Sequence, residues 1–282
     1  MESNGDEGLL HTRRKPRIMA ENHQPDTGVA LITGGARGIG EATARALASA
    51  GMTVVIADIL DGHSVAESIG PTAMFEHLDV TDANNWQAVL SRTEERAGVL
   101  TALINNAGIL DFGSIETFTP DQFHRILEVN LVGPYLGMHL AADQLRRSGS
   151  GVIVNVSSTA GLMGYPNLAG YVASKWGLRG LTKAASLDLS ADGIRVCSVH
   201  PGPIRTPMTE GLGDELTMNQ PIPRYGEADE VARMIRFIVT EATYSTGAEF
   251  IVDGGAVTGL TAALDIPEAA PNADGSPTRA SR

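Results

Sequence analysis

Three side chains, Ser158, Tyr171 and Lys175, have the types and the spacing to move a proton at one small site. Tyr171 and Lys175 stand four residues apart, so on a helix they project from the same face. With five Tyr and three Lys in 282 residues, chance would place such a pair in roughly one similar chain in twenty. The competing interpretation is an ordinary solvated pair on a helix surface.

The chemistry of these side chains favours acid–base catalysis over the solvated pair. A free tyrosine, with a pKa of about 10, is a poor base at neutral pH, so its phenolate must be stabilised. An ammonium on the same helix face can do this through its charge. All but two of the other basic residues are Arg, and a guanidinium does not reproduce the compact charge of Lys175.

Short β-branched runs alternate with helical stretches through the middle of the chain. Strands spaced by helices imply right-handed βαβ crossovers and a parallel sheet covered on both faces. The sequence therefore predicts an α/β protein with a Rossmann-like, doubly wound parallel sheet in a single domain. The predicted strands are Val29–Thr33, Thr53–Ala57, Ala102–Ile104, Val152–Val156, Arg195–Val199 and Glu249–Val252.

The first predicted strand runs into a glycine-rich turn, TGGARGIG at residues 33–40, which precedes a helix-forming stretch at 41–50. Glycines permit a tight turn, and the helix N-terminus offers unpaired N–H groups to a pyrophosphate. Glycines that serve structure alone are the alternative. The predicted cofactor contacts here are Gly34, Arg37, Gly38, Ile39 and Gly40.

The second strand ends at Asp58, about 20 residues beyond the glycine turn, where a carboxylate can accept hydrogen bonds from the adenosine ribose. The same charge would repel a 2′-phosphate. Arg37 would favour that phosphate, although it could equally neutralise Asp58. We predict NAD rather than NADP, with a solvated strand-end carboxylate as the alternative for Asp58.

Two further segments are expected to contact the dinucleotide. Asp79 and Val80 follow the strand-like stretch 75–78, where the carboxylate could meet the adenine amino group or could cap the helix that begins near Thr81. A later turn holds Asn106, Ala107 and Gly108, whose small residues would let the backbone approach the cofactor. A plain Asn-Gly turn is the alternative.

Bulk properties exclude several classes of protein. A formal charge of −12 and a pI near 5.0 argue against a general nucleic-acid binder. Cys197 is the only cysteine, so an internal disulfide cannot form, and no residues have zinc-site spacing, which predicts no metal. We also expect no membrane segment, a cytoplasmic location, disordered tails at 1–27 and 261–282, and one catalytic domain at 28–260.

These motifs, TGGARGIG, NNAG, Ser158, YVASK and Pro201-Gly202, occur in an order and spacing that resemble the short-chain dehydrogenase/reductase family. The resemblance covers roughly residues 28–260. Within that family, stretches such as SSTAGLMG, SVHPGPIRTPMT and YSTGAEFIVDGG look like the bacterial 3α,20β-hydroxysteroid dehydrogenases. The resemblance implies hydride transfer between a nicotinamide cofactor and a secondary alcohol or ketone, in a homo-oligomer that is typically a tetramer.

Residue roles also follow from the resemblance. It makes Tyr171 the catalytic acid/base, Lys175 its activator and a ribose contact, and Ser158, rather than Ser157, the hydroxyl that holds the substrate oxygen. Asn130 becomes the fourth member, with a side chain that could hold a water for a proton relay. The resemblance further places Pro201, Gly202, Ile204 and Thr206 against the nicotinamide, although a simple Pro-rich turn is the alternative.

The substrate is expected to be apolar, because several apolar residues fall in loops after strands, where a substrate wall would be built. The segment 208–225 is predicted to form a mobile lid over the site. A hydroxysteroid or terpenoid fits such a wall. The rivals are a 3-ketoacyl thioester reductase that uses NADPH, and a non-catalytic dinucleotide sensor or scaffold. The predicted wall residues are Leu110, Phe112, Leu162, Met163, Tyr165, Met208 and Leu212.

Overall fold

Seven parallel strands form one sheet in the order β3-β2-β1-β4-β5-β6-β9. The structure is a computed structural model that describes residues 28–259, so both predicted tails lie outside the described residues. The predicted doubly wound sheet is confirmed. The strands are β1 (Val29–Thr33), β2 (Thr53–Asp58), β3 (Ala73–His77), β4 (Leu100–Asn105), β5 (Val152–Val156), β6 (Arg195–Pro201) and β9 (Glu249–Val252).

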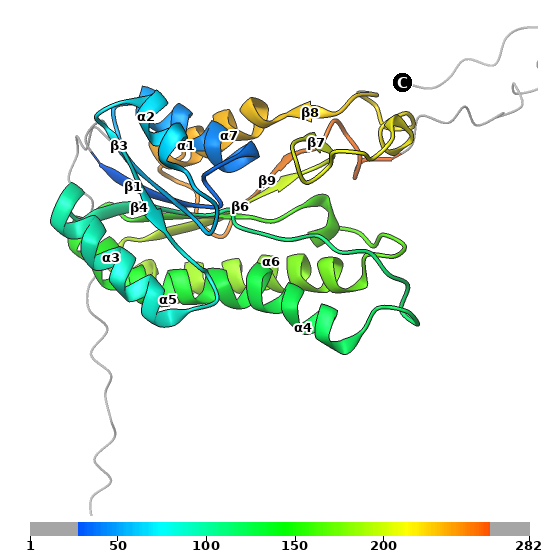
Figure 1. Ribbon diagram of the computed structural model, residues 1–282, viewed down its shortest axis with the longest axis horizontal. Helices are drawn as coiled ribbons and strands as arrows, with labels where there is room; N and C mark the ends of the chain where they lie inside the picture. The colour runs from blue at the N-terminus through cyan, green and yellow to red at the C-terminus, as the bar shows by residue number, and fades with distance from the viewer. Residues whose placement is uncertain (1–27, 260–282) are drawn as a thin grey trace, which may run out of the picture.

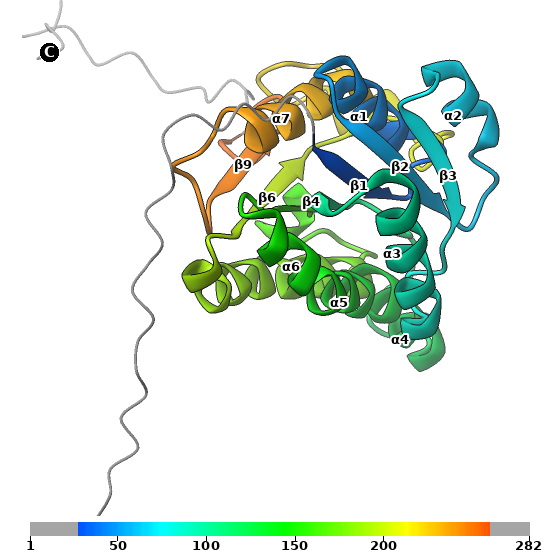
Figure 2. The same ribbon diagram turned by 90° about the vertical axis from the view of Figure 1, so that its left-hand side faces the viewer.

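Helices cover both faces of this sheet, as Figures 1 and 2 show. On one face lie α1 (Gly38–Ser49), α2 (His63–Ile69) and α7 (Ala228–Thr240), and on the other lie α3 (Ala83–Ala97), α5 (Gly133–Ser148) and α6 (Ala169–Asp188). Two short turns, η2 (Thr159–Gly161) and η3 (Ser190–Asp192), flank α6. The sheet is therefore the middle layer of three.

Side-chain alternation along β1 explains the two apolar cores. Ala30 and Ile32 point into the core beneath α1 and α7, whereas Val29 and Leu31 point into the core above α3 and α5. All five residues of β1 are buried, as expected for a strand covered on both faces.

The order of the strands reverses between β1 and β4, which are neighbours in the sheet. From β1 the chain steps outward to β2 and β3, then returns to the other side of β1 for β4, β5 and β6. In a doubly wound sheet this switch point leaves a crevice beyond the carboxyl ends of the strands, where ligands bind. The topology therefore locates the site before any side chain is considered.

Element boundaries agree with the prediction at β1, β5 and β9 and differ elsewhere by a few residues. Helix α1 begins at Gly38, three residues before the predicted start, because the end of the glycine turn already has helical hydrogen bonding: Glu41 N–H donates to the Arg37 carbonyl at 3.2 Å. Strand β6 continues to Pro201, two residues beyond its predicted end. As a result, Gly38 of the glycine turn belongs to a helix, and Pro201 of the Pro201-Gly202 motif belongs to a strand.

One long helical stretch is interrupted by a change in its hydrogen-bond pattern just before Gly133 and Pro134. Helix α4 (Pro120–Leu127) begins with a capping box between Thr119 and Gln122. It runs into a π-helical segment, η1 (Glu128–Val132), before α5 starts at Gly133. Such π-bulges often mark functional sites, and this one carries Asn130.

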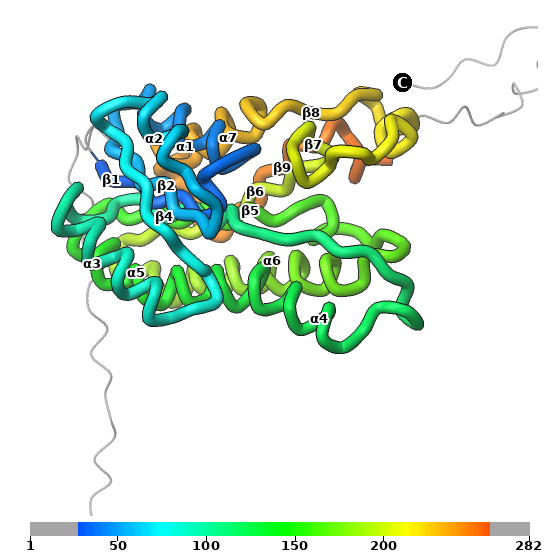
Figure 3. The backbone as a smooth tube through the Cα atoms, viewed as in Figure 1, coloured from blue at the N-terminus to red at the C-terminus, as the bar shows by residue number. Residues whose placement is uncertain are grey.

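A small layer stands beyond the ends of the strands. It consists of β7 (Ile204–Arg205) paired with β8 (Gly226–Glu227), and η4 (Asp214–Leu216) lies in the connection between them. Figure 3 shows this connection, in yellow, facing α4 and α6 across the ends of the strands. Across residues 28–259, none of the helices has the length and apolar character needed to cross a bilayer.

Candidate active site

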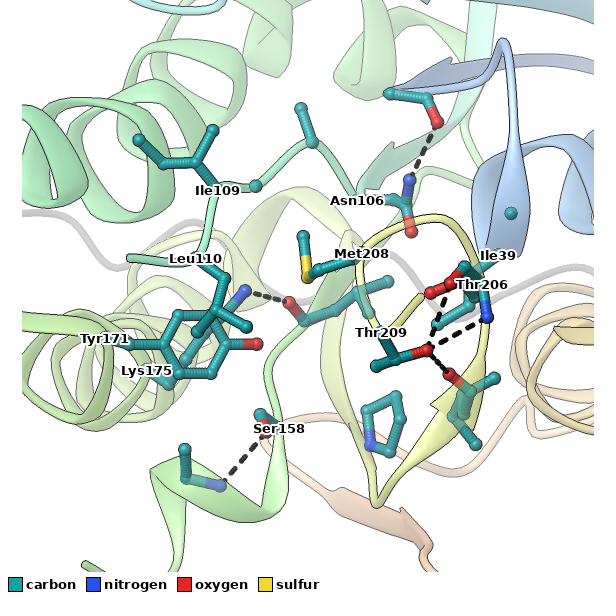
Figure 4. A pocket seen from close by; sticks show the side chains of 18 of the residues that line it. Ile39, Asn106, Ile109, Leu110, Ser158, Tyr171, Lys175, Thr206, Met208 and Thr209 are labelled. Carbon is teal, nitrogen blue, oxygen red and sulfur yellow. Dashed lines mark hydrogen bonds between the residues drawn. The ribbon is translucent and has the colours of Figure 1, made fainter. Parts of the chain in front are cut away.

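A cavity of about 1020 Å³ lies at the carboxyl ends of β1, β4, β5 and β6, at the switch point of the sheet. It takes in every predicted catalytic and cofactor residue except Gly40 and Asn130. Figure 4 shows part of its lining. The predicted residues in the lining are Gly34, Arg37, Gly38, Ile39, Asp58, Asp79, Val80, Asn106, Ala107, Gly108, Ser158, Tyr171, Lys175, Pro201, Gly202, Ile204 and Thr206.

Tyr171 lies in the first turn of α6, and its hydroxyl points into the cavity near Ser158 (Figure 4). Ser158 follows β5 and caps the short turn η2, where its Oγ accepts the Ala160 N–H at 3.1 Å. Burial raises the pKa of the Tyr171 phenol, and a hydrogen bond with Ser158 partly offsets that rise. The phenol therefore holds its proton at neutral pH and has a hydroxyl partner.

Lys175 is one turn further along α6 and is 4% exposed. Its Nζ donates to the Val156 carbonyl at 2.9 Å and lies 5.6 Å from the centre of the Tyr171 ring. Burial lowers the pKa of the ammonium to about 8, so at neutral pH most of it is charged. The expected phenol and cation on one helix face are thus both present inside the cavity.

The adjacent serine, Ser157, has a different position. It is buried, and its hydroxyl donates to the Lys175 carbonyl at 3.2 Å, which ties the end of β5 to α6. This contact fits the expectation that Ser157 serves structure, while Ser158 faces Tyr171.

Asn130 is fully buried in η1, and it is not among the residues that line the cavity. Its Oδ1 accepts the Ile109 N–H at 2.8 Å, and its Nδ2 donates to the Ile109 carbonyl at 3.0 Å and to Ser174 Oγ at 3.2 Å. Both amide hydrogens therefore have acceptors within the protein. The side chain joins the loop after β4 to α6.

The glycine turn offers an anion site at the start of α1. Arg37 occupies the N-cap position without a side-chain cap, so the first N–H groups of the helix have no side-chain acceptor. Gly34, with φ +64°, lies so close to the next loop that a Cβ would come within 2.9 Å of Ala107 Cα. An uncapped helix N-terminus in the lining of a cavity fits the pyrophosphate of a dinucleotide.

Gly40 lies outside the cavity, unlike its predicted place. A Cβ at this position would collide with the Gly34 carbonyl. Gly40 therefore allows α1 to pack against the turn, and it serves the cofactor site indirectly.

Asp58 ends β2 beside the glycine turn and is 8% exposed. Its two oxygens accept the N–H groups of Ala36 and Leu60, each at 3.0 Å. Within residues 28–259 Arg37 forms no ion pair with it, so no guanidinium is paired with this carboxylate at the edge of the cavity. That arrangement fits a ribose and disfavours a 2′-phosphate.

Asp79 is exposed, and it does not cap the following helix as one alternative proposed. Its Oδ1 accepts from Thr81 N at 2.9 Å and Thr81 Oγ1 at 2.7 Å, while Asp82 provides the cap of α3. Val80 is buried beside it, and both residues line the cavity.

Asn106 and Ala107 are held against the glycine turn by Thr33. The Thr33 hydroxyl accepts the N–H groups of Asn106 and Ala107 at 3.0 and 2.9 Å. In return, the Asn106 amide donates to the carbonyls of Thr33 and Gly34 at 2.9 and 3.1 Å. The two predicted cofactor loops therefore form one hydrogen-bonded unit.

A second hub, Thr209, organises the loop after β6 (Figure 4). Its Oγ1 lies 2.6 Å from the Ile204 carbonyl and accepts the Thr206 N–H at 3.1 Å. The Thr206 side chain approaches the glycine turn, where a Cβ on Gly38 would lie 3.4 Å from it. Sequence reasoning missed Thr209, because a threonine in a loop carries no signal by itself.

The apolar wall is confirmed for five of the seven expected residues, whereas Leu162 and Met163 do not line the cavity. Both follow the end of η2 at Gly161. Several lining residues that the sequence did not reveal come from α4, η1 and the connection between β7 and β8. Among these are Arg125, Val129, Leu216 and Gln220, while Leu168 at the start of α6 and Ala256 after β9 also line the cavity.

Metal-assisted chemistry has no visible ligand set in the described residues. Within 28–259, no cluster of three or more His, Cys, Asp or Glu side chains could hold a metal ion.

Comparison with known proteins agrees with this geometry. The 3-alpha-(or 20-beta)-hydroxysteroid dehydrogenase of Mycobacterium bovis is 43% identical over 235 residues, covering 82% of this chain and 90% of that protein. The trans-4-hydroxycyclohexanecarboxylate dehydrogenase of Sinomonas cyclohexanicum is 44% identical over 243 residues, covering 82% and 93%.

A solved structure is also similar. The crystal structure of levodione reductase superimposes with a TM-score of 0.79 at 31% identity, covering 82% of this chain and 98% of that one. Residues 28–217 match the family described as short chain dehydrogenase. The chain therefore belongs to the short-chain dehydrogenase family.

Proposed function

We propose that this enzyme interconverts a secondary alcohol and its ketone on an apolar ring, with NAD(H) as the hydride carrier. The observation that carries the proposal is the Tyr171 phenol, partnered by Ser158 and adjacent to the buried Lys175 ammonium, inside a large cavity with apolar walls. The named activities of the relatives, on a hydroxysteroid and a hydroxycyclohexane ring, support the substrate class.

The residues divide the chemistry between them. In ketone reduction, Tyr171 donates its proton to the carbonyl oxygen, and Ser158 orients that oxygen through a hydrogen bond. Lys175 stabilises the phenolate that remains, and solvent then restores the proton. In alcohol oxidation the phenolate takes the hydroxyl proton. A nicotinamide dinucleotide bound in the cavity would accept or supply the hydride.

Asp58 supports NAD as the cofactor. Its carboxylate stands at the edge of the cavity without an ion-pair partner among residues 28–259, so a 2′-phosphate would meet an unshielded negative charge. The glycine turn, Asp79, Val80, the loop 106–108 and the residues 201–206 would hold the rest of the dinucleotide. We extend the proposal to one catalytic domain at 28–260, a homotetramer and a cytoplasmic location.

The test follows nicotinamide absorbance with purified protein. NADH and NADPH are each offered with 3- and 20-ketosteroids, substituted cyclohexanones and acetoacetyl thioesters, for both the wild type and Asp58→Ala. We expect turnover of a cyclic ketone with NADH, and a shift toward NADPH in the variant. Thioester turnover with NADPH would replace both the substrate and the cofactor proposals.

Absence of turnover with every pair, despite binding of NADH, would favour a dinucleotide sensor over an enzyme. Size-exclusion chromatography with light scattering separates a tetramer from smaller assemblies.

A further inference from the structure

His200 is a buried titratable residue to which the mechanism above gives no role. It lies in β6, immediately before Pro201, and is 0% exposed. Its ring spans the gap between the sheet and the turn that carries Ser158. An imidazole that is fully buried needs partners for both nitrogens, and the identity of those partners fixes its tautomer.

The hydrogen bonds of His200 admit one arrangement. Nδ1 lies 3.1 Å from the Ser158 carbonyl oxygen, which only accepts, so Nδ1 carries the hydrogen. Nε2 lies 2.9 Å from Ser198 Oγ and therefore accepts the serine hydroxyl. Burial lowers the pKa of the ring, which keeps it neutral. A neutral imidazole thus donates from the sheet to the backbone of Ser158.

Apart from the hydrogen bond between its hydroxyl and Tyr171, the other contacts of Ser158 are local. Its Oγ accepts the Ala160 N–H at 3.1 Å, and its carbonyl also accepts the Gly161 N–H at 2.9 Å. Both donors belong to η2, the turn that Ser158 itself caps, so they would move together with it. The His200 contact is different, because it joins the Ser158 peptide group to a central strand of the sheet.

We propose that His200 is a positioning residue, which fixes the Ser158 peptide group so that the Ser158 hydroxyl stays opposite Tyr171. This inference rests on the proposed function of Ser158 and assigns no proton transfer to the imidazole itself. A misplacement of a catalytic group by about 1 Å can cost about 10²-fold in rate. Loss of the tie should therefore reduce the rate of the reaction more than the binding of the cofactor.

Three variants of His200 test whether the position of its hydrogen-bond donor matters, and not only the presence of a donor. An asparagine amide nitrogen can occupy the place of Nδ1, a glutamine amide nitrogen reaches the place of Nε2, and leucine offers neither. In assays with a cyclic ketone and NADH, we expect kcat of His200→Leu and His200→Gln to fall by about tenfold or more. We expect His200→Asn to stay within about threefold of the wild type, and KM for NADH to change little in all three.

A second readout does not depend on turnover. Because the hydrogen bond with Ser158 lowers the pKa of Tyr171, displacement of Ser158 should raise that pKa. Ultraviolet titration of tyrosinate, as the difference from a Tyr171→Phe background, should show this rise in His200→Leu and His200→Gln but not in His200→Asn.

Two results would contradict a positioning role for His200. Equal kcat and equal Tyr171 titration in the wild type and His200→Leu would overturn the proposal, as would equal impairment of the asparagine and glutamine variants. If His200→Leu fails to bind NADH because it does not fold, the asparagine and glutamine pair still decides. A wild type that binds NADH but reduces no ketone would contradict the proposed function alone, and the tyrosinate titration would then test His200.

Discussion

At the scale of the residue, burial acts on Tyr171 and Lys175 in opposite senses. It raises the pKa of the phenol and lowers the pKa of the ammonium to about 8. Without cofactor, the pair therefore rests with the phenol protonated. Proton transfer from Tyr171 leaves a phenolate. The Lys175 ammonium attracts this phenolate more strongly than it attracts the neutral phenol, so its charge stabilises the transfer as it proceeds.

Replacement of Tyr171 by phenylalanine removes only the hydroxyl that transfers the proton. We expect kcat to fall by about 10²- to 10⁴-fold, with little change in the dissociation constant for NADH measured by fluorescence. Tyr244→Phe, which removes the same atom from a fully exposed side chain, is the matched control and should leave kcat unchanged. A Tyr171→Phe enzyme with near-normal turnover would contradict the assignment of the acid.

Lys175→Met tests how much unfolding free energy the protein loses by burying the charge of Lys175. Lys175 loses its proton near pH 8 in the folded state and near 10.5 in the unfolded chain. The cost of burial is therefore fully present below pH 8 and is relieved as pH rises from 8 to 10.5. After the lost hydrogen bond to Val156 is counted, we expect the variant to gain about 1–2 kcal/mol of unfolding free energy at pH 7.

Urea unfolding of the wild type and Lys175→Met at pH 7 and pH 10 measures this gain, which should shrink at pH 10. Turnover of the variant should be lost at both pH values. An equal difference in stability at the two pH values would show that the charge of Lys175 is not the cause.

At the scale of the element, the backbone around β1 and α1 could be predicted well because its signals are local. The β-branched run of β1 indicates a strand, the glycines after it indicate a turn, and the helix-forming residues that follow indicate α1. The π-helical segment η1 could not be predicted, since a change in hydrogen-bond register leaves the composition of a helix unchanged. The sequence therefore identifies Asn130 but not the π-helical segment that holds it.

Apolar wall residues show the same limit. Leu110 and Met208 were expected in the cavity and line it, whereas Met163 was expected there and does not. All three sit in loops after strands, so the pattern treats them alike. Only the path of each loop in space separates them, and that path depends on contacts between segments distant in the sequence, such as those of Ile109, next to Leu110, with Asn130.

The same substitution in two helices tests the contact between α1 and the glycine turn. Gly40→Ala introduces a Cβ that collides with the Gly34 carbonyl, so we expect a loss of about 1–3 kcal/mol in unfolding free energy and weaker NADH binding. Gly180→Ala, at an exposed position of α6 with open space around it, should instead stabilise the protein by about 0.5–1 kcal/mol. Chemical denaturation and NADH titration measure both; a stabilising Gly40→Ala would contradict the close contact.

At the scale of the whole molecule, charged side chains tie the last two strands of the sheet, the edge strand β9 and its neighbour β6, to the helical layers. Glu249 of β9 accepts from Arg179 at 2.8 Å and pairs with Lys183 at 2.6 Å, both on α6. On the other face, the Arg195 guanidinium donates to the carbonyls of Ile238 and Ala242 at the end of α7 and beyond it. These contacts connect β9 to α6, and β6 to α7 and the segment after it, at this edge of the sheet.

Glu249 should therefore make the stability of the whole fold sensitive to acid. Its hydrogen bond with Arg179 lowers the pKa of the carboxyl from 4.5 to about 2. The stabilisation is present above about pH 4.5 and is lost as pH falls toward 2. Because Lys183 is half exposed, solvent screening reduces the contribution of Glu249, Arg179 and Lys183 to the unfolding free energy to about 1–2 kcal/mol.

We expect Glu249→Gln to lower the unfolding free energy by about 1–2 kcal/mol at pH 7 and by less at pH 3.5, measured by urea denaturation at both pH values. Glu241→Gln is the matched control, because Glu241 pairs with Arg236 at 3.8 Å with both side chains largely exposed, and its effect should stay within about 0.5 kcal/mol. A pH-independent loss in Glu249→Gln would mean that the side chain stabilises the edge strand by packing rather than by charge. The acid sensitivity of the fold would then have to arise from other carboxylates.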